Sequence, residues 1–209
     1  MKIISIEKNE KASAMCKVYL DNPISFTLPR KRIDLLELKE GTEISEDRLN
    51  YILDTEVYAS AKSAAVSFLA LRLRTALEVE RKLLVMGYEE ATIEKVIENL
   101  KEISYINDYN YACKYISEKA KLKPKSTRLL AMELSHRGIS DEIIERTMSE
   151  FVTDDSEVAI ELLKKKYSKY STFDEKLINK MKSFLVSRGF SLNQAARAVS
   201  SFVPDEIDL

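Results

Sequence analysis

The chain has 209 residues, a formal net charge of −1 at pH 7 and charged side chains at 32% of its positions. Only four glycines and four prolines accompany 45% apolar residues, a composition that favours a helical globular protein over a disordered or collagen-like one. The two cysteines, Cys16 and Cys113, lack the spacing of a zinc-binding motif, and the N-terminus lacks the apolar run of a signal peptide. We therefore expect a cytoplasmic protein without a metal, a cofactor or a membrane-spanning segment.

The first 54 residues are predicted to form a small β-rich extension. Apolar and polar residues alternate there in three short segments, which are separated by turn-forming residues such as Asp21-Asn22-Pro23. The expected strands are residues 2–7, 14–20 and 24–28. The alternation places Ile4 and Ile6 on one face of the first strand, and the short connections predict an antiparallel three-stranded meander.

Two short helices are expected to complete this extension. Pro29 is predicted to occupy the first position of one helix, because its fixed φ angle suits a helix start. Ser45 is predicted to cap a second helix that ends near Leu53. A break then separates the extension from a longer, alanine-rich helix over about residues 55–72.

Three glycines, Gly87, Gly138 and Gly189, recur at a constant spacing of 51 residues. Each follows a stretch with leucines at helical spacing and precedes a bulky apolar residue. These features are typical of a helix that ends at a left-handed glycine, with the next side chain packing back on the last turn. A constant period of this length indicates tandem supersecondary units.

Each period is predicted to contain three helices joined by short turns. Helix-start signals recur as three capping boxes, at residues 75–78, 172–175 and 191–194, and as single caps at Ser126 and Ser140. Because one three-helix unit buries little surface alone, the units are expected to stack on one another.

The fold class predicted is therefore mainly α, with a small N-terminal β-meander followed by three tandem three-helix repeats in an elongated, curved array. The expected boundaries are residues 1–54 for the extension and 55–104, 105–152 and 153–209 for the repeats. Apolar residues thirteen positions after each glycine are predicted to face the core. These residues are Leu100, Phe151 and Phe202.

The residues show no pattern of a catalytic site. His136 is the only histidine, and the four glycines are isolated from one another, so neither a metal-binding cluster nor a phosphate-binding loop is indicated. Acidic pairs such as Asp154 and Asp155 lie at predicted helix starts, where they complement the helix dipole. The sequence predicts a protein that is not an enzyme.

Charge is distributed unevenly along the chain. Residues 34–56 and 140–157 are mostly acidic, whereas residues 111–138 and 161–189 are mostly basic. Such blocks form either ordinary solvated helix faces or separate basic and acidic surfaces. Tyrosines among the lysines would allow sequence-independent contact with nucleic acid, but the net charge provides no overall positive field.

Residues 77–88 and 96–112 resemble the core signature of the bacterial RecX regulatory proteins. In that signature a helix ending in glycine and an aromatic residue leads through a third helix to a segment rich in aspartate and aromatic residues. Residues 132–139 resemble its second unit, and residues 18–28 and 39–46 resemble the N-terminal extension of Gram-positive members.

Two positions depart from this family pattern. Ser104 stands where the family usually has glycine, so the preceding helix must end without the residue best suited to that position. Residues 119–125 are rich in lysine where many members are rich in arginine and glycine, and lysine offers point charges in place of bidentate contacts.

The resemblance implies a modulator of the RecA recombinase, with roles in homologous recombination, DNA repair and the SOS response. Such proteins bind the RecA–DNA filament along its groove and suppress the recombinase, ATPase and co-protease activities. We expect a monomer that contacts RecA and, through its basic clusters, single- or double-stranded DNA. The residues alone leave a second interpretation open, a stand-alone helical module that binds nucleic acid without sequence preference.

The side chains expected to contact the partner or nucleic acid are all basic, and they fall into three clusters along the chain. They are Arg72, Arg74, Arg81, Lys82, Lys119, Lys121, Lys123, Lys125, Arg128, Lys164, Lys165, Lys166 and Lys169.

Overall fold

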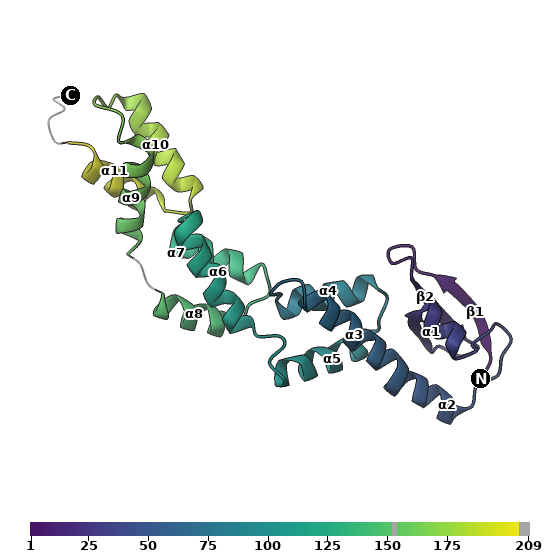
Figure 1. Ribbon diagram of the computed structural model, residues 1–209. Helices are drawn as coiled ribbons and strands as arrows, with labels where there is room; N and C mark the ends of the chain where they lie inside the picture. The colour runs from purple at the N-terminus through teal and green to yellow at the C-terminus, as the bar shows by residue number, and fades with distance from the viewer. Residues whose placement is uncertain (152–153, 205–209) are drawn as a thin grey trace. The chain divides into compact units, whose positions relative to one another are not determined.

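A computed structural model of the chain describes residues 1–151 and 154–204 (Figure 1). The chain is mainly helical and carries a small three-stranded sheet near its N-terminus, which confirms the predicted fold class. It divides into two compact units, Met1–Asn107 and Asp108–Leu209, which are described separately below. The elongated, curved arrangement of the repeats stays a prediction.

The sheet of the first unit is the predicted antiparallel meander. Its strands are β1 (Ile3–Lys8), β2 (Met15–Leu20) and β3 (Ser25–Pro29), paired in the order β1-β2-β3. Val18 of β2 lies opposite Phe26 of β3, and both side chains are fully buried. The alternating apolar residues therefore define the buried face of the sheet.

The buried face of β1 differs from the prediction. Ile3 is 1% exposed and Ile6 packs against the core, whereas Ile4, which was predicted to share a face with Ile6, is 59% exposed. The pairing of β1 with β2 shifts between Ile3 and Ser5, as in a β-bulge. An extra residue in one strand reverses the alternation at that point, and the simple period-two pattern does not reveal it.

Helices follow the sheet with fewer breaks than expected. Pro29 was predicted to be the first residue of a helix, but it is the N-cap residue that directly precedes α1 (Arg30–Leu35). The Ser45 side chain accepts a hydrogen bond from the Arg48 amide and caps α2, as expected. The predicted break near residue 54 is wrong, because the chain continues from α2 (Glu46–Tyr51) through the π-helix η1 (Ile52–Val57) into α3 (Tyr58–Leu69). No glycine or proline lies between residues 46 and 69 to stop the helix.

Helices α3, α4 (Ala76–Val85) and α5 (Glu90–Glu102) form the first triplet. The capping box at Thr75 and Glu78 is present with both of its hydrogen bonds. Gly87 has φ +89°, and the Tyr88 amide donates to the Leu83 carbonyl at 3.2 Å, so α4 ends in the predicted left-handed glycine turn.

The Gly87 turn also docks the first triplet on the sheet. Thr27 of β3 donates a hydrogen bond from Oγ1 to the Gly87 carbonyl at 2.7 Å. Asn9, in the loop between β1 and β2, donates from Nδ2 to the Val85 carbonyl at 3.3 Å. One hydrophobic core extends from the sheet into the triplet, so strands and helices of this unit fold together.

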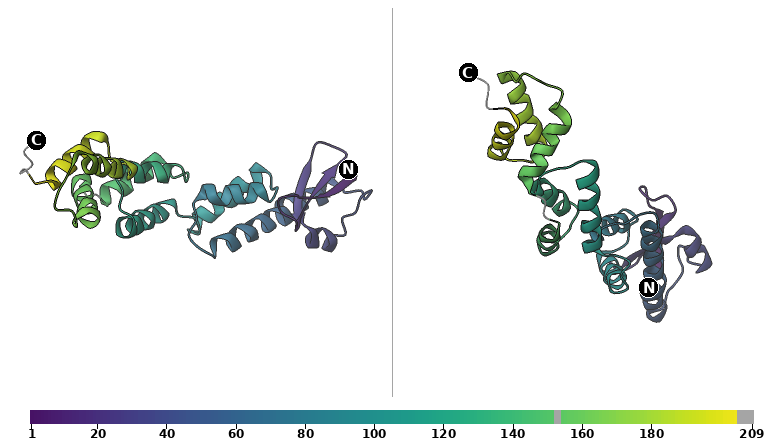
Figure 2. Two further views of the ribbon diagram at one scale, coloured as in Figure 1. Left: turned by 90° about the horizontal axis from the view of Figure 1, so that it is seen from above. Right: turned by 60° about the vertical axis from the view of Figure 1, so that its left-hand side comes forward.

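The second unit contains two more triplets. The second triplet comprises α6 (Asp108–Leu122), α7 (Thr127–Ser135) and α8 (Asp141–Glu150); the third comprises α9 (Asp155–Tyr167), α10 (Glu175–Ser187) and α11 (Leu192–Phe202). Figure 2 shows each set of three helices from two further directions. Each triplet has its own cluster of buried apolar residues. The caps at Ser126 and Ser140 and the capping box at 191–194 are all present.

The third triplet docks on the second through the start of α7. The Ser126 amide donates to the Arg188 carbonyl at 3.1 Å, and the Arg128 guanidinium donates to the Gly189 carbonyl at 3.1 and 3.2 Å. The Thr127 amide donates to Asp155 at 2.9 Å. The Gly189 turn of the third triplet therefore packs on the start of α7 in the second triplet, just as the Gly87 turn packs on the sheet.

Two predictions in the second unit are wrong. Helix α10 is capped by Asp174 and not by Thr172; the Asp174 side chain accepts a hydrogen bond from the Leu177 amide at 2.8 Å. Because the helix begins after Asp174, Phe173 lies outside it and packs against Phe202 in the core. Phe151 is 41% exposed although it was predicted to be buried. Helix α8 ends at Glu150, so Phe151 lies beyond the helical face that its counterpart Leu100 occupies in α5.

Candidate partner-binding surfaces

The described residues provide no assembled catalytic centre. His136 is the C-cap residue of α7 and is exposed. Across residues 1–151 and 154–204, no group of three or more histidine, cysteine, aspartate or glutamate side chains is arranged to hold a metal ion. Within the same ranges, no helix is long and apolar enough to cross a membrane.

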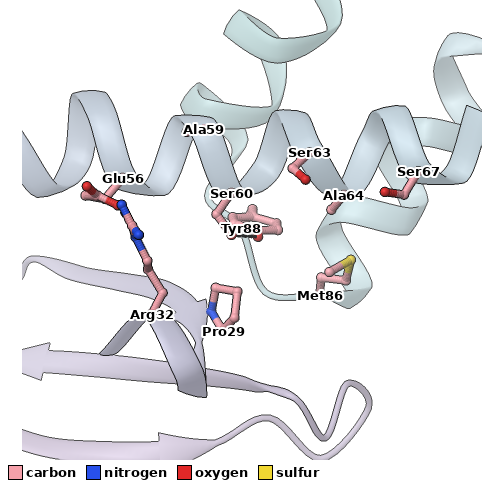
Figure 3. A pocket seen from close by; sticks show the side chains of 10 residues that line it. All are labelled: Pro29, Arg32, Glu56, Ala59, Ser60, Ser63, Ala64, Ser67, Met86 and Tyr88. Carbon is pink, nitrogen blue, oxygen red and sulfur yellow. Dashed lines mark hydrogen bonds and ion pairs between the residues drawn. The ribbon is translucent and has the colours of Figure 1, made fainter. Parts of the chain in front are cut away.

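A cavity of about 390 Å³ lies between the start of α1 and one side of α3 (Figure 3). Small side chains of α3 make up half of its lining, and Arg32 and Glu56 meet at one end (Figure 3). Its lining consists of Pro29, Arg32, Glu56, Ala59, Ser60, Ser63, Ala64, Ser67, Met86 and Tyr88.

The charged groups of this cavity are paired with each other. Glu56, on the π-helix η1, is 4% exposed and accepts hydrogen bonds from the Arg32 Nε and, at 3.0 Å, from the Tyr51 hydroxyl. The hydrogen bond from Arg32 is the main reason that the pKa of Glu56 lies below its ordinary value. Because Arg32 and Glu56 pair with each other, this ion pair joins α1 to η1 and has a structural explanation.

The basic residues predicted in the first unit have different environments. Arg74 stacks 4.0 Å from the Phe68 ring centre and lies 3.7 Å from Glu78, and Arg72 lies 3.6 Å from the same carboxylate. Both arginines therefore support the N-terminus of α4. Arg81 and Lys82 are exposed on α4 and have no ion pair among the residues that the structure describes.

The lysine-rich segment at the end of α6 is partly used within the second triplet. Lys125 is paired with Glu133 of α7, which also accepts a hydrogen bond from the Tyr115 hydroxyl at 2.7 Å. The Lys119 ammonium lies 5.1 Å from the Tyr115 ring centre, and the Arg137 guanidinium lies 4.6 Å from it. We call these five residues the Tyr115 cluster; it ties the end of α6 to α7.

Electrostatic effects in the Tyr115 cluster favour the ionised carboxylate. Burial disfavours ionisation of Glu133, but hydrogen bonds from Lys125 and Tyr115 outweigh it, so the pKa of Glu133 is lowered. Burial and the hydrogen bond to Glu133 raise the pKa of Tyr115. By contrast, Lys121 and Lys123 are exposed and have no ion pair in the described ranges.

The last predicted cluster lies at the C-terminal end of α9. The Lys166 ammonium lies 3.7 Å from the Phe184 ring centre, and the Arg188 guanidinium lies 5.5 Å from the same ring. Lys164, Lys165 and Lys169 face solvent. Together with the exposed bases described above, seven predicted contact residues point to solvent without an ion pair in the described part of the chain. They are Arg81, Lys82, Lys121, Lys123, Lys164, Lys165 and Lys169.

Prediction from the sequence missed two features. Arg137 and Arg188 lie over aromatic rings; no local pattern marks Arg137, whose partner Tyr115 is on another helix, whereas the i,i+4 spacing of Phe184 and Arg188 was an available signal. The second feature is a groove of about 550 Å³ between α4 and α5, which is lined by four glutamates and by apolar side chains. Glutamates at every fourth position of α5 were the available signal for it.

Comparison with protein families finds three matches in the described helices. The model described as the first three-helix domain of RecX matches residues 61–100. The second three-helix domain of RecX matches residues 107–148, and the third matches residues 153–199. The three occur in the same order as the three triplets.

Individual proteins give the same result over nearly the whole chain. "Regulatory protein RecX" of Clostridium acetobutylicum is 31% identical over an alignment of 198 residues that covers 92% of each chain. The protein of that name from Streptococcus sanguinis is 32% identical over 95% of this chain and 76% of its own. A crystal structure of RecX from Lactobacillus salivarius, 29% identical, matches with a TM-score of 0.60 over 69% of this chain and 96% of its own.

Proposed function

We propose that this chain, which belongs to the RecX family of regulatory proteins, binds the filament that the RecA recombinase forms on DNA and inhibits the recombinase, ATPase and co-protease activities. The observation that carries the proposal is the ordered match of all three RecX three-helix domains. A regulator of this kind works by binding, so it requires surfaces and no catalytic residues.

Two kinds of surface support such a role. Exposed lysines in both α6 and α9 are available to meet DNA phosphates, and lysine contributes sequence-independent charge contacts. The first triplet carries exposed acidic side chains on α5, which repel DNA and suit a protein partner. A protein that contacts a nucleoprotein filament needs both kinds of surface.

The exposed lysines also favour the second interpretation, a module that binds nucleic acid alone. The two functions differ in their salt dependence and in their preferred target. A DNA-coating module binds naked single-stranded DNA tightly, with an affinity that falls steeply as salt rises.

Fluorescence anisotropy with labelled single-stranded DNA separates the two functions. We expect the protein to bind the preformed RecA filament more tightly than the naked strand, and to do so as a monomer. Tighter binding to the naked strand, with a steep loss at higher salt and no preference for the filament, would refute regulation through the filament.

A further inference from the structure

The groove between α4 and α5 combines an apolar floor with a carboxylate rim. Ile93 is buried at the bottom, Ile97 is half-buried and Leu84 is 41% exposed at the edge. Glu80 projects from α4, whereas the remaining glutamates of the rim come from α5. The groove therefore presents apolar surface to solvent between a row of three glutamates on α5 and the single carboxylate of Glu80 on α4.

The carboxylates of this rim are not neutralised within the protein. Glu90, Glu94 and Glu98 follow one another at every fourth position of α5, so their side chains lie on one side of the helix and repel each other. Among the described residues, none of these three and no atom of Glu80 forms an ion pair, and Lys101 is the one basic side chain in the lining. The arrangement costs folding energy, and a cationic occupant would relieve it.

The complete row of three carboxylates belongs to the first triplet only, although Asp141 of α8 corresponds to Glu90. At the spacing of 51 residues, Glu94 corresponds to Glu145 in α8, and Glu98 corresponds to Ser149. In α11 the same two positions are Ala196 and Ser200. The row of carboxylates is thus not a requirement of the three-helix design, because the third triplet has none of the three.

We infer that the groove between α4 and α5 binds a lysine- or arginine-rich segment of the protein partner, with apolar side chains of that segment seated against Leu84 and Ile97. The carboxylates exclude DNA and anionic lipid, and the apolar floor selects a peptide over small cations. This inference rests on the proposed function, since it assigns a surface to the protein component of the filament.

The test uses a fluorescein-labelled amphipathic peptide of leucine and lysine and the full-length protein. We expect the peptide to bind wild type, and the double variant Glu94→Lys, Glu98→Lys to bind it about tenfold more weakly or worse. Glu145→Lys is the matched control, because it makes the same change at the equivalent exposed position of α8 and is expected to leave binding unchanged. A second peptide with serine in place of leucine is expected to bind weakly to all variants.

Three outcomes would overturn the inference. They are no binding to wild type, equal losses in Glu145→Lys and in the double variant, or equal binding of the leucine and serine peptides. Circular dichroism of each variant establishes that it is folded, and Leu84→Ser provides a second, uncharged change at the groove that is expected to weaken the leucine peptide alone.

Inhibition of RecA measured in parallel keeps this inference distinct from the proposed function. If the peptide does not bind but RecA is inhibited, only the groove assignment fails. If the peptide binds in the groove and RecA is unaffected, the proposed function fails while the groove remains a basic-peptide site. Wild-type inhibition that persists undiminished in the double variant would also count against the assignment.

Discussion

At the scale of single residues, the left-handed glycines serve two purposes that are separable by mutation. Gly189 and Gly41 both have positive φ, which costs any residue with a Cβ atom strain energy. A Cβ at Gly189 would lie 2.5 Å from Ser126 Oγ and closer still to Leu129 Cβ, whereas a Cβ at Gly41 would meet only Lys2 Cε at 3.9 Å. Gly189 is therefore required both by its backbone conformation and by close packing, whereas Gly41 is required by its backbone conformation alone.

Alanine substitutions test this distinction. Gly41→Ala is expected to lower the free energy of unfolding by about 1 kcal/mol through backbone strain. Gly189→Ala is expected to lower it by about 2–4 kcal/mol, because overpacking adds to the strain. Urea denaturation followed by circular dichroism measures both, and equal losses would show that the third triplet does not depend on close approach at Gly189.

Ser104 is the reverse case, since a residue with a side chain occupies the position of a helix-ending glycine. Its φ is +60°, and the Tyr105 amide donates to the Leu100 carbonyl at 2.8 Å, as in the glycine turns. Ser104→Gly is expected to raise the melting temperature, with a gain of about 1 kcal/mol in unfolding free energy. Ser200→Gly, inside α11, is the control and is expected to lower the melting temperature. A lower melting temperature for Ser104→Gly as well would show that the left-handed conformation of Ser104 does not strain the protein.

Glu133 gives the protein a predictable response to acid. Its pKa in the folded state lies below the ordinary value of 4.5, so its stabilising effect is complete above that pH and is lost as the pH falls through the lower, folded-state value. Glu133→Gln is expected to lower the melting temperature near neutral pH, with a difference from wild type that shrinks as the pH falls below the ordinary glutamate pKa of 4.5. Glu145→Gln, which removes an exposed carboxylate without an ion pair in the described ranges, is the control and is expected to leave the melting temperature near neutral pH unchanged; a pH-independent difference for Glu133→Gln would rule out this linkage.

At the scale of helices and strands, local chemistry predicted most boundaries. Capping residues such as Thr75 and Ser191, and the glycine turns, act on backbone groups within a few residues, so a short stretch of sequence contains the necessary information. The features that were not predicted depend on distant partners. The bulge in β1 depends on its pairing with β2, and the N-terminus of α10 depends on Phe173 packing in the core.

The same limit applies to the basic surface. Sequence identified the lysine clusters but did not distinguish Lys121 and Lys123, which face solvent, from Lys125, which pairs with Glu133 on the next helix. The buried Glu56 of the π-helix was not predicted for the same reason. It pairs with Arg32, which lies 24 residues earlier in the sequence. Tests of DNA or RecA contact should therefore alter Lys121 and Lys123 and leave the Tyr115 cluster intact.

At the scale of the whole molecule, the two compact units carry different surfaces. The first unit, Met1–Asn107, contains the acidic groove, and the second, Asp108–Leu209, contains most of the predicted contact lysines that face solvent. This division agrees with a regulator that contacts protein through one unit and phosphate through the other. Its near-neutral net charge keeps general attraction to nucleic acid low.

The most direct test of this account is the single-stranded-DNA-dependent ATPase activity of RecA in the presence of the full-length protein. We expect inhibition at protein concentrations below that of RecA, and a clear loss of potency in the variant Lys121→Glu, Lys123→Glu at unchanged circular dichroism. Full ATPase activity in the presence of an excess of folded wild-type protein would contradict the central claim that this chain regulates the RecA filament.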